Sequence, residues 1–327
     1  LRGRRSASLS PNLRKGLAPM PDVLLLQPPI RDFYLTRKRT QPYGLACLAG
    51  SLRSAGYSVR ILDALATAKS RLRPLPAEMR HLRRFYPRQD HSPLALFHTF
   101  RHFGYSREHL ARLVRDARPR LVGISANFSA YAGEALSLAR AVKQAYPQAP
   151  VVMGGHHATC LPEAVLSNAA VDYVVCGEGE AALVALVTAL GRGTDPLLIP
   201  GVGGRWPDGT FRLPAEIAVV DLDPCPPPAV DLIDQHYYRR RRKRALVITA
   251  SRGCPFACSY CCMTREGPVP YRRRSVESVL DELAQGAASS RVAAGSAVRR
   301  PDVGGPDLGG PDVGFIDFED ENLALDK

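Results

Sequence analysis

Short apolar runs alternate with longer amphipathic segments from residue 22 to about residue 190. The segments GLACLAGSLRSAG and GEALSLARAVKQAY carry apolar residues at the three- and four-residue spacing of a helix. These two segments are flanked by apolar runs, and five such runs occur: DVLLLQ (22–27), SVRIL (58–62), RLVGIS (120–125), PVVMGG (150–155) and DYVVCG (172–177). Strands and helices alternating in this order predict an α/β fold with a doubly wound parallel sheet.

The chain changes character after about residue 190. IPGVGGRWPDGTFRLP predicts a small hairpin around PDGT, and the next stretch is rich in proline and then in arginine. A second strand and helix are expected from ALVITA and from about Ser275, which is suited to be the N-cap. We therefore expect a basic disordered leader (1–20), a first α/β domain (21–213), a linker (214–244) and a second domain (245–327).

Two segments interrupt this plan. Residues 66–118 are basic and contain PAEMRHLRRFY and SREHLARLVRDA, which predict extra helices. These helices serve either as a cover over the sheet edge or as a contact for a substrate or partner. Residues 286–314 are rich in Gly, Ala and Ser and contain the near-repeat PDVGG PDLGG PDVGF, which cannot bury a core. We expect a flexible insertion there.

The formal net charge of +13 is concentrated in three short segments. Residues 1–20 contribute +5, RRRRKR at 239–244 contributes +6 and RRR at 272–274 contributes +3. Charge this local is typical of a solvated tail and a basic linker. Contact with nucleic acid or anionic lipid is the alternative. Aromatic residues stand beside the arginine run only at Tyr237 and Tyr238, so we expect no nucleic-acid partner.

The apolar runs are far too short to cross a bilayer, and the leader LRGRRSASLSPNLRKG lacks the apolar stretch of a secretory signal. A chain of 327 residues with 45% apolar content has enough material for buried cores in about two domains. We therefore expect a soluble cytoplasmic protein. In that reducing compartment, its eight cysteines are expected to be thiols or metal ligands.

Three of the cysteines stand close together in RGCPFACSYCC, directly after the run ALVIT. Cys254, Cys258 and Cys261 follow one another at offsets of four and three residues. Thiolates at this spacing on one loop can reach three irons of a 4Fe-4S cluster and leave the fourth iron open to a chelating substrate or cofactor. Zinc is the weaker alternative, because its fourth ligand would have to be the adjacent Cys262.

A ligand site is expected at the carboxyl ends of the parallel strands, where open α/β sheets bind their ligands. Four loops meet at that edge, namely QPPIRDFYLTRKRTQPYG, SANFSAYAG, GGHHATCLPE and GEGE. Their glycines allow a large flat ligand to approach the backbone closely. By themselves, His156 and His157 are more typical of hydrogen-bonded loop residues than of metal ligands.

The loop RGCPFACSYC resembles the CxxxCxxC cluster loop of the radical S-adenosylmethionine enzymes. Other segments are similar to their cobalamin-binding subfamily: QPYGLACLAGSLRSAGYSVRILDA, GGHHATCLPEAVL, VDYVVCGEGE and FEDENLALD. The resemblance covers residues 21–327 apart from the two interruptions. It implies a Rossmann-like cobalamin-binding domain followed by the first part of a TIM-like barrel, in a chain truncated within that barrel.

Carried over by position, the resemblance assigns sites for three cofactors. Cys254, Cys258 and Cys261 would hold the 4Fe-4S cluster, whose open iron would chelate S-adenosylmethionine. Further contacts with S-adenosylmethionine fall on Tyr260, Asp320, Glu321 and Asn322. The corrin of cobalamin would be lined by Ser125, Gly154, Gly155, His157, Thr159, Gly177, Glu178 and Gly179. The loop after the first strand contains no histidine, so no protein imidazole is expected below the cobalt.

The resemblance also implies an activity, in which S-adenosylmethionine is cleaved reductively and a methyl group is transferred to an unactivated carbon or phosphorus centre. A radical cyclase or rearrangement enzyme of the same subfamily is an alternative, because the motifs are shared. A non-catalytic corrinoid-binding remnant is another. The expected partners are a small-molecule substrate and an electron donor such as flavodoxin or ferredoxin.

Overall fold

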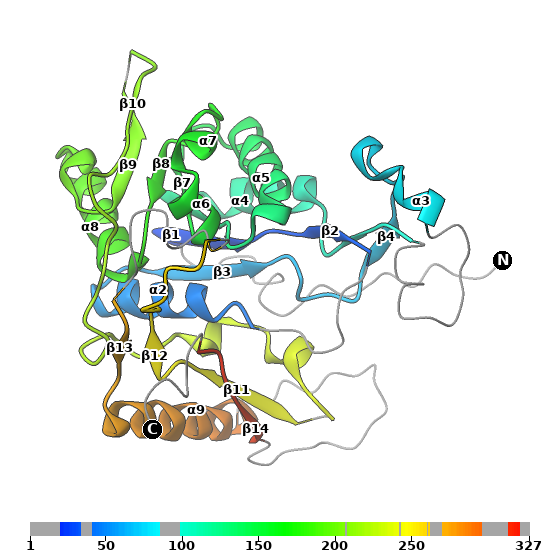
Figure 1. Cartoon of the computed structure of the whole chain (residues 1–327). Coiled ribbons are helices and arrows are strands. Elements are labelled where there is room, and N and C mark those ends of the chain that lie inside the picture. Colours follow the sequence, from blue (N-terminus) through cyan, green and yellow to red (C-terminus); the bar gives the residue numbers. More distant parts are fainter. Residues whose placement is uncertain are drawn as a thin grey trace.

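The computed structural model describes residues 20–33, 41–85, 99–206, 208–241, 243–259, 261, 270–295 and 313–320. Within them, the largest element is a seven-stranded sheet in the order β10-β9-β8-β7-β6-β1-β3 (Figure 1). Five neighbouring strands are parallel. They are β3 (Val59–Asp63), β1 (Val23–Gln27), β6 (Leu121–Ser125), β7 (Val151–Gly154) and β8 (Tyr173–Val175). All five strands predicted for the first domain are therefore confirmed.

Helices cover both faces of this sheet, as a doubly wound fold requires (Figure 1). One face packs against α2 (Tyr43–Ser54) and α8 (Gly179–Arg192), and the other packs against α4 (Arg107–Ala117) and α5 (Ala132–Ala145). Two short helices, α6 (His156–Cys160) and α7 (Pro162–Leu166), join β7 to β8. The central strands read as continuous apolar runs because both of their faces are buried.

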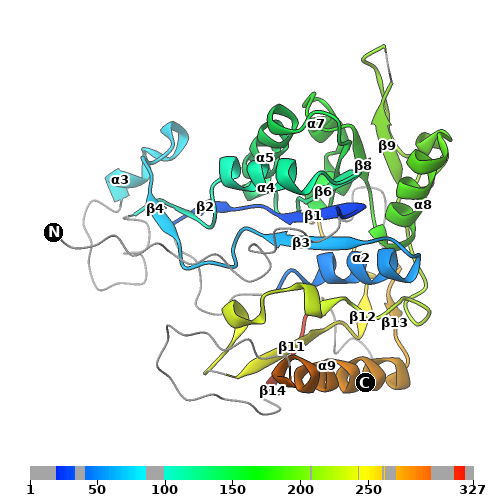
Figure 2. The same ribbon diagram turned by 180° about the vertical axis from the view of Figure 1, so that it is seen from behind.

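Residues 66–118, predicted to form extra helices, contain both helices and short strands. The helical part is α4 together with a 3-10 turn, η1 (Ala77–Met79), and the single turn α3 (Leu82–Phe85). In addition, a small antiparallel sheet forms at one end of the central sheet (Figures 1 and 2). Its strands are β2 (Ile30–Asp32), β5 (Arg101–Phe103) and β4 (Ser70–Leu72). Each has only three residues, too few to show the alternation by which a strand is predicted.

The hairpin predicted around PDGT is confirmed by the antiparallel strands β9 (Val202–Arg205) and β10 (Phe211–Arg212). The connector that follows holds the 3-10 turns η5 (Val230–Leu232) and η6 (Gln235–Tyr238), and another turn, η4 (Pro196–Leu198), precedes the hairpin. No helix among the described residues is both long and apolar enough to cross a membrane.

The second unit contains β11 (Arg244–Ile248), α9 (Val276–Gly295) and β14 (Val313–Phe318), with the two strands parallel and adjacent. This strand-helix-strand arrangement is the repeating unit of a TIM-like barrel. Ser275 is its helix cap as predicted, because its Oγ accepts from the Ser278 N–H at 3.2 Å.

The flexible insertion predicted at 286–314 is wrong at both ends, since α9 continues to Gly295 and β14 begins at Val313. The alanines of that stretch are strong helix formers, so composition alone misled the prediction. Residues 296–312 of the predicted insertion lie outside the described residues, as does the leader up to residue 19.

The arginine-rich segments are not merely solvated. Arg240 donates to Asp317 of β14 at 2.6 Å, and both side chains are mostly buried. Arg272 and Arg274 form ion pairs with Glu178 and Glu282. Three arginines of these segments therefore join parts of the fold to one another.

Candidate functional site

A cavity of about 1060 Å³ lies between the central sheet and the second unit. It is larger than the roughly 300–1,000 Å³ of ordinary small-molecule pockets. One wall consists of the loops that follow β1, β6, β7 and β8, and the opposite wall consists of residues from the stretch 249–261. Apolar side chains of the wall include Leu25, Leu45, Leu48, Phe128 and Val152. The carboxyl ends of the parallel strands thus open onto a space suited to a large, mostly apolar ligand.

The sheet-side wall contains most of the residues expected to line a corrin. These are Ser125, Gly154, Gly155, Thr159, Gly177, Glu178 and Gly179. Thr159 joins two of the loops, because its Oγ1 accepts from the Gly177 N–H at 2.9 Å and donates to the Gly155 carbonyl at 3.1 Å. The loops after β7 and β8 are therefore held together as one surface.

His157 differs from the expectation. Its side chain is buried, it is not among the residues that line the cavity, and its Nδ1 lies 2.9 Å from the Ser129 Oγ. Burial lowers the pKa of His157, so the neutral imidazole is favoured. The cavity is lined instead by the preceding residue, His156. Both residues belong to the first turn of α6, where neighbouring side chains point about 100° apart, so only one of them can face the cavity.

Two glycines of this wall are required by the protein's own backbone. Gly155 has φ +109°, and a Cβ there would overlap the side chain of Asn127. Gly177 has φ +86°, and a Cβ there would overlap the backbone of Ala218. Gly154 is different, because the nearest atom to an added Cβ would be 3.6 Å away. Folding therefore requires glycine at positions 155 and 177 but not at 154, where the missing side chain leaves the backbone open to the cavity.

The cysteines line the opposite wall. Cys254, Cys258 and Cys261 are all partly exposed, and the Cys261 N–H donates to the Cys258 carbonyl at 3.0 Å. In the described part of the chain, no three His, Cys, Asp or Glu side chains converge as a ready-made metal site. The thiols thus share one cavity wall without being preassembled around a common centre. Tyr260 lies outside the described residues.

Asp320 holds the backbone at the start of the cysteine loop. Its carboxylate accepts from the Ala250 N–H at 3.0 Å, from the Ser251 Oγ at 2.6 Å and from the Ser251 N–H. It therefore fixes the backbone where the cysteine loop begins, and it is not among the residues that line the cavity. The adjacent Glu319 lines the cavity. Glu321 and Asn322 lie outside the described residues.

A buried ion network connects the two walls, and sequence reasoning missed it. Arg272 donates to both carboxylate oxygens of Glu178, at 2.8 and 2.7 Å. Arg252 pairs with Glu180 at 2.7 Å and lies 3.7 Å from Glu178. The signal in the sequence was the pairing of an acidic GEGE loop with arginines on both sides of the cysteine motif.

The ion pairs of this network keep Glu178 and Arg252 in their charged forms. Burial alone would raise the pKa of Glu178, but the hydrogen bonds from Arg272 and from the Val220 N–H more than offset it and hold that pKa below its usual value. Burial alone would lower the pKa of Arg252, but the neighbouring Glu180 carboxylate raises it overall. Glu178 is therefore ionised at neutral pH and stabilised by the Arg272 guanidinium.

A second contact network ties α2 to α9. The Tyr43 hydroxyl donates to Glu282 at 2.8 Å, and Arg274 donates to the same carboxylate at 2.6 Å and to the Thr249 carbonyl at 3.1 Å. Burial raises the pKa of the nearby Cys47 thiol to about 12, so Cys47 is a neutral cavity-lining thiol at physiological pH.

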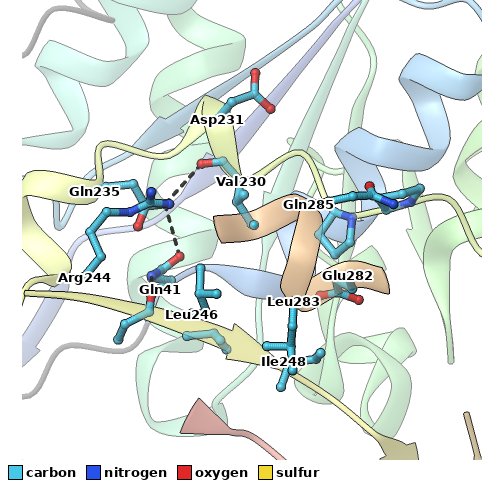
Figure 3. Close-up of a pocket in the computed structure, with 15 residues that line it drawn as sticks. Gln41, Val230, Asp231, Gln235, Arg244, Leu246, Ile248, Glu282, Leu283 and Gln285 are labelled. Carbon is cyan, nitrogen blue, oxygen red and sulfur yellow. Dashed lines mark hydrogen bonds between the residues drawn. The ribbon is translucent and has the colours of Figure 1, made fainter. Parts of the chain in front are cut away.

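A much smaller pocket of about 80 Å³ lies beside this joint (Figure 3). Across it, the Gln235 Nε2 donates to the Gln41 Oε1 at 3.2 Å and to the Val230 carbonyl at 3.1 Å (Figure 3). Gln41 in turn donates to the Ala245 carbonyl at 2.8 Å. The volume suits a few water molecules rather than a cofactor, and the side chains tie the linker to β11.

Comparison with known proteins agrees with this geometry. Residues 91–187, which include β6, β7 and β8, match the B12 binding domain family. The chain is 26% identical, over 80% of its length, to cytidylyl-2-hydroxyethylphosphonate methyltransferase of Streptomyces wedmorensis. The chain is thus similar to a B12 binding domain family and to methyltransferases that include a radical S-adenosylmethionine enzyme.

Another relative is the anaerobic magnesium-protoporphyrin IX monomethyl ester cyclase of Rubrivivax gelatinosus, 32% identical over 54% of this chain and 33% of the cyclase. Among solved structures, the radical S-adenosylmethionine methyltransferase TsrM of Kitasatospora setae, with tryptophan and an S-adenosylmethionine analogue bound, superposes with a TM-score of 0.52. It is 25% identical and matches 82% of this chain and 45% of TsrM. The chain spans 51% of the Streptomyces methyltransferase, 33% of the cyclase and 45% of TsrM. It therefore corresponds to about half, or less, of each of these proteins.

Proposed function

We propose that this chain is the cofactor-binding portion of a cobalamin-dependent radical S-adenosylmethionine enzyme that transfers a methyl group to an unactivated centre. One observation carries the proposal: the glycine loops of the B12-binding match and the three cysteines line the same cavity. In this proposal, a first domain at 21–213 and a linker at 214–244 precede the barrel portion at 245–327, and the protein works in the cytoplasm, where thiols stay reduced.

The sheet-side wall fits cobalamin in size and in chemistry. Its volume exceeds that of ordinary pockets, its side chains are mostly apolar, and Gly154 leaves room for close approach. The residues that would hold the corrin are Ser125, Gly154, Gly155, Thr159, Gly177 and Gly179, with His156 in place of His157. Cobalamin, when bound, supplies a cobalt-bound methyl group for transfer. The apolar wall would exclude water from that group.

The cysteine wall fits a 4Fe-4S cluster in donor type and spacing. Cys254, Cys258 and Cys261 would hold it, and their thiols would converge as it assembles. The cluster, when bound, supplies the electron that cleaves S-adenosylmethionine. Tyr260, Glu319, Glu321 and Asn322 are proposed contacts for S-adenosylmethionine. A small-molecule substrate and a flavodoxin- or ferredoxin-type electron donor complete the reaction.

A radical cyclase is the second candidate, and the 32% identity to the Rubrivivax cyclase favours it. The products separate the two activities. Methyl transfer from S-adenosylmethionine yields S-adenosylhomocysteine, whereas a cyclase yields 5'-deoxyadenosine and a cyclised product without S-adenosylhomocysteine.

The test is anaerobic reconstitution with iron, sulfide and hydroxocobalamin, then incubation with S-adenosylmethionine and a chemical reductant, followed by assays for 5'-deoxyadenosine and S-adenosylhomocysteine. We expect the products to vanish in Cys258→Ser. They should persist in Cys225→Ser, because Cys225 is a half-buried cysteine outside the motif whose Sγ donates to the Asp221 carbonyl. Iron incorporation and cobalamin absorbance are measured on the same samples.

Two results would contradict the proposal. Failure of the wild-type chain to retain hydroxocobalamin would remove the corrin site. Cobalamin binding without any nucleoside product would instead identify a non-catalytic corrinoid-binding chain.

A further inference from the structure

The loop that carries the cysteines is closed at its base by a two-stranded stem. β12 (Ser251–Arg252) pairs antiparallel with β13 (Arg272–Arg273), so that Arg252 lies opposite Arg272. Both ends of the segment 253–271 are therefore brought together. The three cysteines follow this stem directly, and the position of the stem decides where the thiols lie relative to the cavity.

Each of the two stem arginines, Arg252 and Arg272, binds a carboxylate of the sheet-side wall. Arg272 binds Glu178 through two hydrogen bonds, and Arg252 pairs with Glu180 at 2.7 Å. The side chains of Glu180 and Glu178 are only 8% and 15% exposed, and those of Arg252 and Arg272 only 24% and 20%. Breaking a pair this well buried leaves an uncompensated charge away from water, which exposed pairs do not do.

The carboxylates also belong to the surface on which a ligand would rest. Gly177, Glu178, Gly179 and Glu180 all line the cavity, and the Gly177 N–H is fixed by Thr159. A ligand that presses on this backbone therefore acts on the segment that carries both carboxylates. The same segment is the anchor of the cysteine stem.

We propose that Glu178 and Glu180 are positioning residues that anchor the stem of the cysteine loop, so that occupation of the sheet-side wall and order of the cysteine loop are coupled. The inference rests on the proposed function, because it takes cobalamin as the ligand of that wall. The anchor itself, however, is a property of the chain without any cofactor.

The anchor is tested by alkylating the cofactor-free chain with iodoacetamide and following Cys254, Cys258 and Cys261 by mass spectrometry. In Glu178→Gln or Glu180→Gln we expect these thiols to react roughly tenfold faster than in the wild type, because loss of a buried charge partner frees the stem to open. The buried Cys160, which does not line the cavity, reports global unfolding and should keep its wild-type rate.

The matched control is Asp231→Asn. Asp231 accepts two hydrogen bonds from Arg53, both 2.8 Å long, in an exposed pair of the same chemistry that does not contact the stem. In Asp231→Asn, the alkylation rates of Cys254, Cys258 and Cys261 should equal those of the wild type. Equal rates in wild type, Glu178→Gln and Glu180→Gln would overturn the anchor. Faster reaction of Cys160 along with the loop thiols would overturn it as well, by showing general destabilisation.

The coupling is tested by repeating the alkylation with hydroxocobalamin. The wild-type loop thiols should be protected several-fold. Arg272→Gln breaks the pair with Glu178 at a residue that does not line the cavity, so it should lose that protection while it still binds hydroxocobalamin by absorbance. Binding without protection in the wild type would overturn the coupling. If the wild type fails to bind hydroxocobalamin at all, the proposed function fails, and the rates without cobalamin still decide the anchor.

Discussion

Arg272 and Glu178 form a two-bond ion pair, with 2.8 Å from Nη1 to Oε2 and 2.7 Å from Nη2 to Oε1. The two residues are 94 positions apart in the sequence. Arg272 follows the cysteine loop and Glu178 follows β8, so the pair spans the interface between the central sheet and the second unit. Arg272 also donates to the Val220 carbonyl at 2.6 Å, which draws the linker into the same joint.

Removing the guanidinium should destabilise the chain. In Arg272→Gln, the Glu178 carboxylate keeps the Val220 N–H and the more distant Arg252, and we expect a loss of about 1–3 kcal/mol in the free energy of unfolding. Arg115→Gln is the control, because Arg115 forms an exposed ion pair with Asp116 on α4, and its effect should stay within about 0.5 kcal/mol. Urea unfolding measures both, and equal losses would contradict the role of the pair.

The contribution of Glu178 should depend on pH with a definite sign. Its pKa is held below the ordinary value of 4.5, so the folded chain prefers the ionised form and binds fewer protons than the unfolded chain. The stabilisation is fully present above about pH 4.5 and is lost as the pH falls through the folded pKa. The difference in unfolding free energy between wild type and Glu178→Gln should be constant near neutrality and shrink in acid. A difference that grows in acid would contradict this assignment.

Two glycine substitutions separate folding from ligand contact. Gly177→Ala adds a Cβ that overlaps Ala218 at a positive φ, so we expect a loss of about 1–3 kcal/mol in unfolding free energy. Gly154→Ala meets no atom closer than 3.6 Å and should fold like the wild type. If a corrin rests against Gly154, hydroxocobalamin affinity should nevertheless fall about tenfold or more in Gly154→Ala, the effect of about 1.4 kcal/mol. Titration by absorbance measures this, and unchanged affinity would move the ligand away from Gly154.

Neighbouring acidic residues at the end of β14 should behave differently. Asp320→Ala leaves the Ala250 and Ser251 backbone N–H groups without their acceptor, and we expect about 1–3 kcal/mol of destabilisation. Glu319→Gln, on the cavity wall, should leave stability within about 0.5 kcal/mol and weaken S-adenosylmethionine binding to the reconstituted chain. Thermal unfolding and equilibrium binding separate the two effects. A loss of stability in Glu319→Gln equal to that in Asp320→Ala would contradict the division of roles.

Local sequence signals predicted much of the fold. The five central strands could be predicted because a parallel strand buried on both faces must be apolar throughout, and the Ser275 cap because an N-cap is recognised by residues of the same turn. The strands β2, β4 and β5 could not be predicted, since three residues hold no periodicity and their pairing depends on distant segments. The helix over 286–295 was missed because this stretch was judged together with the Gly- and Pro-rich near-repeat that follows it, although its alanines favour a helix.

The sequence by itself determined the chemistry of the site: three thiols at offsets of four and three, and glycine-containing loops after consecutive parallel strands. Only the tertiary structure decided which neighbour faces the cavity, His156 rather than His157 and Glu319 rather than Asp320. It also decided that Glu178 and Glu180 meet the arginines of the cysteine stem. The physical reason is that residue type and spacing act over one or two turns of chain, whereas side-chain direction and charge pairing depend on how distant segments pack.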